Sequence, residues 1–375
     1  MRVIRLRLRD FRTYAAADVV PGAGLTVVHG ANGAGKTNLL EGLYFGCTGR
    51  SCRTANEREV VRFGAQALRA EVDLTDAEGL THALAVGYAP GEVKRLLADG
   101  ASVERLLDVG FRPLVSVFLP DRLELVKGPP ALRRAHLDQV VAAARPARTA
   151  TRRSYARALA QRNALLARVR AGNAPRDALG AWDLELASHG VALRDDRAAV
   201  VADLVMPFAA ATQQLGLRGK LELRYRPRSR AADAQALAAE LRERLDSDLE
   251  RGFTGHGPHR DDLALLRDGR ELRTYGSQGE QRLGLLALLL AEREVLGAVR
   301  GHPPLLLLDD VMSELDPDRR AALAQRLARD GGQSVITTTD VAQVPGAQSA
   351  EVTRVAVRDG AAVTVAGAGA QERAA

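Results

Sequence analysis

Several features of exported or membrane-bound proteins are missing from this 375-residue chain. It contains no apolar run approaching the ~20 residues that a membrane-spanning helix needs. Residues 1–5 alternate in polarity instead of forming the apolar core of a signal peptide. Cys47 and Cys52 have no histidine pair at metal-ligand spacing beside them, which favours two reduced thiols over a zinc site. These absences predict a cytoplasmic protein without a membrane partner.

Lysine is also scarce, because the 53 basic residues include only Lys36, Lys94, Lys127 and Lys220 as lysines. The formal net charge of +7 permits binding to nucleic acid. An arginine- and alanine-rich composition can equally reflect the base composition of a genome, so the charge leaves both interpretations open. Lys36 stands out, because a chain so biased toward arginine keeps a compact ammonium at this position.

Lys36 lies in a stretch with the spacing of a phosphate-binding loop, G-x-x-x-x-G-K-[ST]. The apolar run at 25–28 predicts a strand before the loop, and the spacing at 38–44 predicts a helix after it. Small residues let successive backbone N–H groups face an anion, and the helix dipole adds partial positive charge there. We expect Lys36 to reach the β- and γ-phosphates of ATP and Thr37 to bind Mg²⁺. The nucleotide-binding residues predicted from this stretch are Gly30, Ala31, Asn32, Gly33, Ala34, Gly35, Lys36, Thr37 and Asn38.

Two kinds of periodicity divide the rest of the chain. Residues 4–9 and several runs between 59 and 97 alternate with a period of two, which predicts an antiparallel β subdomain. Ile4, Leu6 and Leu8 would face the core, and the arginines between them would lie on a sheet edge or, as the less favoured alternative, on a basic track. From about 143 to 251, helical spacing dominates and predicts a compact inserted lobe without the sustained heptads of a long coiled coil. Its first helix would line a DNA path or present a solvated face with Arg145, Arg148, Arg152, Arg153 and Arg157.

A second candidate site element is the pair Asp309 and Asp310, which directly follows the apolar run 305–308. A buried parallel strand delivers an acidic residue to a ligand at its carboxyl end in this way. We expect Asp309 to hold Mg²⁺ and Asp310 to orient the attacking water, so that the catalytic residues are Lys36, Asp309 and Asp310.

A third element precedes the helix expected at about 280–299. Ser277 and Gly279 would present a hydroxyl and free N–H groups to an anion at the helix N-terminus. Because the first loop already takes the γ-phosphate, we expect this helix end to serve the nucleotide of a second copy. A Ser-x-Leu-Asp loop ending at Asp316 comes shortly after the paired acids, and the run 334–340 predicts a last strand.

The order of these elements is similar to that of the ABC-type ATPase heads that include the SMC proteins. Within that class the chain resembles the RecF family, and the likeness extends over essentially the whole chain. The residues that carry it are 118–121, 128–138, 255–261, 275–282, 308–310 and 314–316. The resemblance implies an α/β fold, with a mixed sheet around the phosphate loop, an antiparallel β subdomain and an inserted α-helical lobe. The head would comprise residues 1–142 and 252–375, and the lobe residues 143–251.

The resemblance also implies a mechanism and partners. RecF-like heads are expected to form a homodimer on binding ATP and Mg²⁺, with Ser277, Gly279 and Gln281 of one copy meeting the nucleotide bound by the other. Glu280 and Asp316 would help Ser277 couple the two sites, and ATP hydrolysis would release the dimer. The family acts on DNA at gaps and junctions of single and double strands, together with RecO and RecR, and promotes the loading of RecA.

Some positions depart from the broader ABC pattern. Asp310 replaces a glutamate and is one methylene shorter, which predicts slow turnover. Thr339 stands where many heads have a switch histidine, and Pro120-Asp121 stands where a glutamine senses Mg²⁺. Arg12 would approach the nucleotide or remain an exposed arginine at a strand end. These features favour an ATP-dependent switch over a fast motor.

Three other functions were compatible with these motifs. An SMC-like structural ATPase of chromosome maintenance would need a longer arm. The nucleotide-binding subunit of a transporter would not carry a helical lobe ahead of the serine-glycine element. Binding of ATP without hydrolysis stays open because of Asp310.

Overall fold

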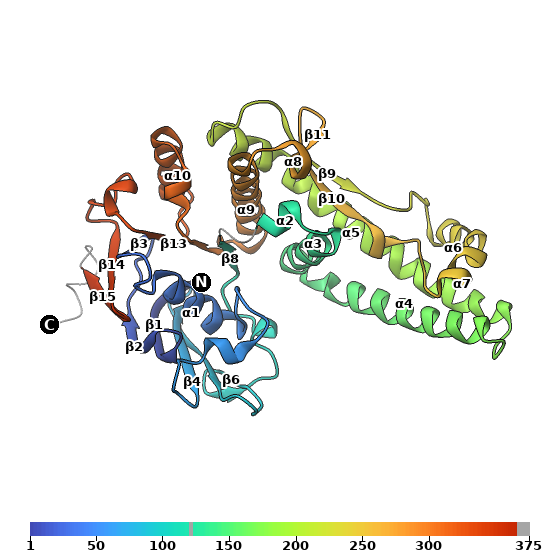
Figure 1. Ribbon diagram of the computed structural model, residues 1–375, viewed down its shortest axis with the longest axis horizontal. Coiled ribbons are helices and arrows are strands. Elements are labelled where there is room, and N and C mark those ends of the chain that lie inside the picture. Colours follow the sequence, from blue (N-terminus) through green and yellow to red (C-terminus); the bar gives the residue numbers. More distant parts are fainter. Residues whose placement is uncertain (120–122, 366–375) are drawn as a thin grey trace. The chain divides into compact units, whose positions relative to one another are not determined.

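The computed structural model describes residues 1–119 and 123–365 of the chain. It forms two compact units (Figure 1). We call Met1–Asp121, Gln214–Gly216 and Leu296–Ala375 the head unit, and Arg122–Gln213 and Leu217–Val295 the arm unit. The sequence suggested boundaries at 142/143 and 251/252, whereas these compact units divide at 121/122 and 295/296. The difference arises because α3 (Pro130–Ala144) packs against β10 (Asp262–Arg267), and both belong to the arm unit.

The first sheet of the head unit is the predicted antiparallel subdomain. Its strand order is β2-β1-β4-β5-β6-β7. The strands are β1 (Arg2–Phe11), β2 (Tyr14–Val19), β4 (Leu68–Thr75), β5 (Thr81–Tyr88), β6 (Arg95–Ala98) and β7 (Ala101–Ser102). Alternating apolar residues face one side, as a sheet with one buried face requires. A register shift after Val3 makes Val3, Leu6 and Leu8 the buried set, while Ile4 is only half-buried.

The prediction that the arginines of β1 lie on a sheet edge was wrong. β1 is an interior strand that pairs with both β2 and β4. Arg5 forms an ion pair with Asp18 on β2, and Arg7 forms one with Asp73 on β4 at 2.9 Å. Cross-strand pairs of opposite charge suit neighbouring positions on one sheet face. Arg5 and Arg7 therefore stabilise strand pairing.

The second sheet of the head unit is mixed and has the order β15-β14-β3-β13-β12-β8. All neighbouring pairs are parallel except β14 with β15. The strands are β3 (Leu25–His29), β8 (Val115–Phe118), β12 (Leu305–Leu308), β13 (Ser334–Thr338), β14 (Thr353–Arg358) and β15 (Ala361–Val365). Because β12 and β13 are both next to parallel strands, their carboxyl ends meet at one edge of the sheet.

Helix α1 (Lys36–Thr48) packs on strands of both sheets, including β1 and β4 on one side and β13 and β8 on the other. Two glycines allow the close approach to the antiparallel sheet. A Cβ atom at Gly42 would lie 2.6 Å from Leu8, and one at Gly46 would lie 2.5 Å from Val72. The helix that follows the phosphate loop is thus fixed by the main core of the head unit. Helix α10 (Pro317–Arg329) follows the acidic strand β12 in the head unit.

The arm unit is mainly helical, as predicted. Its helices are α2 (Glu124–Lys127), α3, α4 (Thr149–Arg170), α5 (Leu179–Gln214), α6 (Ala234–Glu243), α7 (Leu245–Arg251), α8 (Leu272–Tyr275) and α9 (Gln278–Arg300), of which the last residues of α5 and α9 belong to the head unit. Helices α6 and α7 meet at Arg244. A small sheet of β11 (Arg270–Glu271), β10 and β9 (Leu221–Arg226) completes the unit. Among the described residues, no helix is both long and apolar enough to cross a membrane.

Buried charges join the helices of the arm unit to the loop at 254–261. Arg162 is fully buried and donates to Asp183 at 2.7 Å, to Asp248 at 2.8 Å and to Thr254 at 2.7 Å. His259 accepts at Nδ1 from the Tyr155 hydroxyl at 2.7 Å, with Nε2 2.8 Å from the Thr254 carbonyl oxygen. Burial lowers the pKa of His259 to about 4, so the ring is neutral at neutral pH. The loop at 254–261 therefore joins the helices of the arm unit through internal polar contacts.

Candidate nucleotide-binding site

The phosphate loop joins β3 to α1 and has the backbone that anion binding requires. Gly33 and Gly35 have φ values of +79° and +113°, a region that residues with a Cβ rarely enter. Gly35 is the N-cap residue of α1 and supplies no side-chain cap, so the first N–H groups of the helix are left for another acceptor. The Tyr14 hydroxyl donates to the Gly35 carbonyl at 2.9 Å, which fixes the loop against the antiparallel sheet.

The side chain of Lys36 lies against its own loop. Its Nζ donates to the carbonyls of Gly30 at 2.8 Å and Ala31 at 2.9 Å. Burial lowers the pKa of Lys36, while the negative charges of Asp310 and Asp309 act in the opposite direction. The ammonium is therefore held by the loop where the sequence predicts a phosphate-binding cation.

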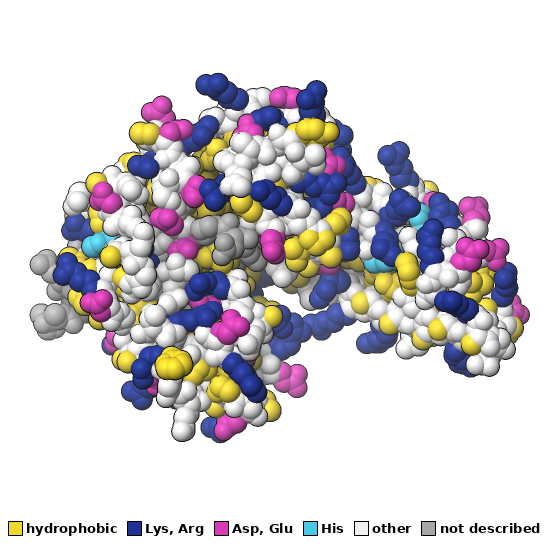
Figure 2. Space-filling view, viewed as in Figure 1, with side chains coloured by type: hydrophobic (Ala, Val, Ile, Leu, Met, Phe, Trp, Pro, Cys, Tyr) yellow, Lys and Arg dark blue, Asp and Glu magenta, His cyan; other side chains and the backbone are white. Residues whose placement is uncertain are grey.

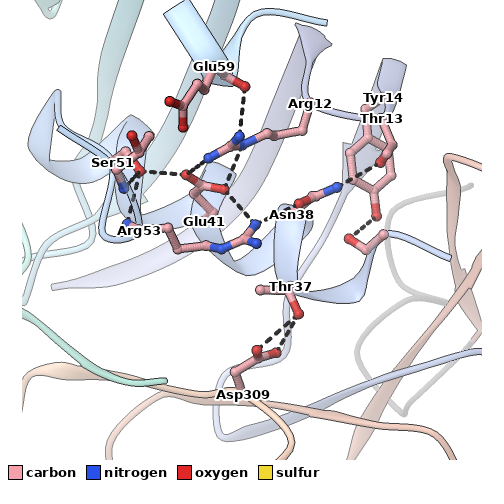
Figure 3. Close-up of polar contacts among 12 residues, drawn as sticks. Arg12, Thr13, Tyr14, Thr37, Asn38, Glu41, Ser51, Arg53, Glu59 and Asp309 are labelled. Atoms are coloured by element: carbon pink, nitrogen blue, oxygen red, sulfur yellow. Dashed lines mark hydrogen bonds and ion pairs between the residues drawn. The ribbon is translucent and has the colours of Figure 1, made fainter. Parts of the chain in front are cut away.

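Thr37 and Asp309 come together as the sequence predicted for a Mg²⁺ site (Figure 3). The Thr37 hydroxyl lies 3.0 Å from Oδ1 and 2.9 Å from Oδ2 of Asp309, which follows β12 directly. Asp309 is only 7% exposed, and burial raises the pKa of its carboxyl. A buried carboxylate beside a hydroxyl offers the oxygen ligands that Mg²⁺ prefers. The donor set thus fits a bound Mg²⁺ with its nucleotide phosphates.

Thr337 is a site residue that the sequence reasoning missed. Its hydroxyl donates to Oδ1 of Asp309 at 2.6 Å and accepts from the backbone N–H of Asp310 at 2.9 Å. It therefore orients both acids from β13, the neighbouring parallel strand. Side chains alternate between the two faces of a sheet, so residues two apart, such as Thr337 and Thr339, belong to the same face. The predicted residue, Thr339, is exposed just beyond the end of β13.

Asp310 has an unusual backbone and an unsatisfied oxygen. Its φ of 46° is left-handed, a conformation that asparagine and aspartate adopt more readily than other residues with a side chain. Its Oδ2 accepts from the Ser313 hydroxyl at 2.9 Å. Its Oδ1 is buried and has no hydrogen-bond partner within the described part of the chain. An unsatisfied buried acceptor next to the Mg²⁺ ligand suits the predicted role of holding a water molecule.

Arg12 lies beside the site but is held by other groups. Its Nε and Nη2 donate to the carboxylate of Glu41 at 2.9 and 2.8 Å, and its Nη1 donates to the Glu59 carbonyl at 2.7 Å (Figure 3). Arg53 donates to Glu41 at 3.1 Å and to Asn38 at 2.9 Å. Glu41 is fully buried on α1. No sequence signal indicated this cluster, because its members come from separate segments that only the folded chain brings together.

The serine-glycine element begins α9 in the arm unit, as predicted. Ser277 and Glu280 form a reciprocal capping box, in which the Ser277 N–H donates to Glu280 Oε2 at 2.8 Å and the Glu280 N–H donates to Ser277 Oγ at 3.3 Å. Ser277 and Gly279 are exposed and accessible to a ligand. Gln281 is buried instead, and its Nε2 donates to the carbonyls of Leu272 at 2.9 Å and Gly276 at 3.0 Å. Its nucleotide contact stays a prediction.

Asp316 caps the N-terminus of α10 by accepting from the Arg319 N–H at 2.9 Å. Its side chain is about half exposed, and it also pairs with the Arg319 guanidinium at 3.2 Å. A role in coupling two copies stays a prediction. Pro120 and Asp121, where other heads carry a glutamine, lie outside the described residues.

Comparisons with known proteins identify relatives of this chain. A family model described as AAA domain matches residues 5–85. The DNA replication and repair protein RecF of Myxococcus xanthus (strain DK1622) is 42% identical over 92% of this chain and 93% of that protein. RecF of Anaeromyxobacter sp. (strain Fw109-5) is also 42% identical, over 91% of this chain and 93% of that protein.

Solved structures give the same assignment. The recombination mediator protein RecF-ATP in the RecFOR pathway has a TM-score of 0.83 and 27% identity, covering 97% of this chain and 98% of that one. The corresponding RecF-ATPrS structure has a TM-score of 0.82 and 28% identity over the same shares. An SMC head bound to the C-terminal winged-helix domain of ScpA has a TM-score of 0.61 at 15% identity, with 97% of each chain covered, and shares the fold alone. With relatives 42% identical over more than nine-tenths of its length, the chain belongs to the RecF family of DNA replication and repair proteins.

Proposed function

We propose that this protein binds ATP with Mg²⁺, dimerises in response, and grips DNA during recombinational repair. The contact of Thr37 with Asp309, supported by Thr337, is the observation that carries the nucleotide part of this proposal. It joins the phosphate loop to the acidic strand, as a shared Mg²⁺ site requires. The RecF structures described with ATP and ATPrS are consistent with it.

Each residue of the site has a defined task in this proposal. Lys36 balances the charge of the β- and γ-phosphates, while Thr37 and Asp309 hold Mg²⁺. The bound ion neutralises charge on the phosphate oxygens. Asp310 positions a water molecule for in-line attack, and its short side chain makes hydrolysis slow. Arg12, Asn38, Gln281 and Thr339 are proposed as additional nucleotide contacts.

The exposed start of α9 gives the proposal its dimeric form. Ser277 and Gly279 present a hydroxyl and a helix N-terminus to solvent, and the phosphate loop within the same chain already provides one phosphate site. A second copy would therefore bring Ser277 and Gly279 to the nucleotide, with Glu280 and Asp316 linking the two sites. Hydrolysis would reset the protein to separate copies.

The neighbouring structures are described as recombination mediators of the RecFOR pathway. We extend that role to this chain, which would act with RecO and RecR at gaps and junctions of single and double strands. ATP-dependent grip on DNA would promote loading of RecA, and DNA would stimulate the slow ATPase. This work takes place with the chromosome, in the cytoplasm.

Light scattering with ATP and Mg²⁺ tests the dimer. We expect ATP to shift the protein from monomer toward dimer, and Lys36→Arg to abolish the shift. Lys220→Arg is the matched control, because the Lys220 side chain is 79% exposed and far from the phosphate loop in sequence. Ser277→Arg should still bind a fluorescent ATP analogue but should fail to dimerise. A wild-type protein that stays monomeric at saturating ATP and Mg²⁺, alone and on gapped duplex, would contradict the composite site.

A further inference from the structure

Helix α4 of the arm unit has a charge pattern that neither folding nor the nucleotide site explains. Between Thr149 and Arg170 it contains six arginines and no aspartate or glutamate. One of them, Arg162, is buried in the ion network of the arm, and the other five are exposed. The chain as a whole is nearly balanced, with 53 basic and 46 acidic residues. An acid-free helix of this length is therefore a local concentration of positive charge.

Three of the five exposed arginines form a stripe opposite the packed face. Tyr155, Ala158, Arg162 and Leu166 are the buried residues of α4. Arg153, Arg157 and Arg168 share the opposite face, because separations of four and eleven residues are close to whole helical turns. We call these three residues the α4 stripe. It extends for about 22 Å along the helix at 1.5 Å per residue.

Neighbouring acidic residues do not neutralise the α4 stripe. At the start of α4, Asp203 pairs with Arg145 at 3.2 Å and Asp196 pairs with Arg148 at 3.1 Å. These two arginines, which the sequence had grouped with those of the helix, are thus already engaged. On α7, which contacts α4, Asp248 pairs with Arg162 and Asp246 with Arg176. Within the described residues, the three arginines of the α4 stripe form no ion pair with an acid.

Two arginines of the α4 stripe, Arg153 and Arg157, cost the helix stability and so are not explained by folding. Arg153 and Arg157 are four residues apart, where like charges destabilise a helix. Arg153 also lies near the N-terminus of α4, whose dipole disfavours a cation, whereas Arg168 lies in the last turn, where the dipole favours one. A face whose only task is solvation usually mixes both signs of charge. The α4 stripe therefore points to an anionic partner.

From these observations we infer that the α4 stripe contacts the phosphate backbone of double-stranded DNA. The inference rests on the proposed function as a DNA-binding protein, and adds to it the contact surface. The only aromatic residue of α4, Tyr155, is 4% exposed and hydrogen-bonded to His259, so the helix offers no platform on which unpaired bases could stack. Between the arginines the exposed residues include Ala156, Ala160 and Ala164, which give no large apolar face for a membrane. Figure 2 shows Lys and Arg side chains prominent on the visible face of the arm unit.

The test compares two triple variants of the full chain with equal loss of charge. One carries Arg153→Gln, Arg157→Gln and Arg168→Gln. The control carries Arg230→Gln, Arg242→Gln and Arg244→Gln, which are exposed arginines of the same unit outside α4. Binding to a duplex of about 30 base pairs and to a single strand of the same length is measured by fluorescence anisotropy with ATP and Mg²⁺, from about 50 to 200 mM salt. Circular dichroism and ATP-dependent dimerisation check that each variant is folded and binds nucleotide.

We expect the α4 variant to lose duplex affinity by up to about 500-fold at 0.1 M salt. Three phosphate contacts give a salt slope of about 2.7, and at 0.1 M salt a slope of this size corresponds to about 2.7 in the logarithm of the binding constant. Its salt slope should be shallower by about the same 2.7, while the single strand and the control variant change much less. Equal losses in both triple variants, or an unchanged duplex affinity in the α4 variant, would overturn the inference and leave the proposed function standing. If the unmodified protein binds no DNA, the proposed function fails and the α4 inference fails with it.

Discussion

Replacing Thr337 with valine should weaken the candidate nucleotide site without changing its shape. Valine fills nearly the same space and is a good strand former, so the packing of β13 is retained. The substitution removes one hydrogen bond to the buried Asp309 carboxylate and one from the Asp310 N–H. A bond to a charged acceptor contributes about 1.5–3 kcal/mol and a neutral one about 1 kcal/mol. The free energy of local opening around β13 should therefore fall by about 2.5–4 kcal/mol.

The same change should lower affinity for ATP in the presence of Mg²⁺. Burial raises the pKa of Asp309, and the hydrogen bonds from Thr337 and Thr37 oppose that rise. Without the Thr337 hydroxyl the pKa rises further, so less of the carboxylate is ionised at a given pH. We expect the loss of affinity to be largest in acid and to diminish as pH increases.

Hydrogen exchange of peptides covering β12 and β13 measures the opening free energy, and titration with a fluorescent ATP analogue measures affinity. Thr337→Ser keeps the hydroxyl and should retain affinity. Thr338→Val is the matched control, because Thr338 is equally buried but its hydroxyl donates to the carbonyl oxygen of Asp340 at 3.0 Å. The reasoning would be refuted if Thr337→Val bound ATP like the wild type, or if Thr338→Val lost as much affinity.

Three further variants test other buried groups. Glu41→Gln should destabilise the head unit by about 2–3 kcal/mol, because a buried carboxylate that holds two guanidiniums is lost. Hydrogen exchange of the α1 amides measures this loss. Unchanged exchange would contradict the prediction. Arg162→Met should destabilise the arm unit by about 3–5 kcal/mol, because it leaves two buried carboxylates unpaired. Urea unfolding followed by Trp182 fluorescence measures this loss. An unchanged unfolding midpoint would count against a stabilising role of the Arg162 ion pairs. The pKa of His259 falls from 6.5 to about 4 on folding, so the unfolded state binds more protons between these values and stability is lost as pH falls from 6.5 toward 4. The free energy of unfolding falls by at most about 3 kcal/mol through this effect. The decrease from pH 7 to pH 5 should be smaller in His259→Gln than in the wild type. Equal pH dependence in both proteins would exclude His259 as the cause.

The family and the main parts of the site could be predicted from the sequence, because each is encoded in a short run of residues. The phosphate loop needs glycines at fixed spacing between a strand and a helix, and Gly33, Gly35, Lys36 and Thr37 supply this locally. The apolar strand before Asp309 and the capping box at Ser277 are likewise local patterns. Their order along the chain was sufficient to indicate the RecF family.

Only the tertiary structure decided which side chains complete the site. The sequence indicated Thr339, but the pairing of β13 with β12 brings Thr337 to Asp309. Arg12 pairs with the buried Glu41, and Arg5 and Arg7 pair with acids on the two strands beside β1. Each of these outcomes depends on strand order and register, which are set by packing among residues far apart in the chain. The spacing of residues therefore determined the chemistry of this protein, and the fold determined the partners of each charged group.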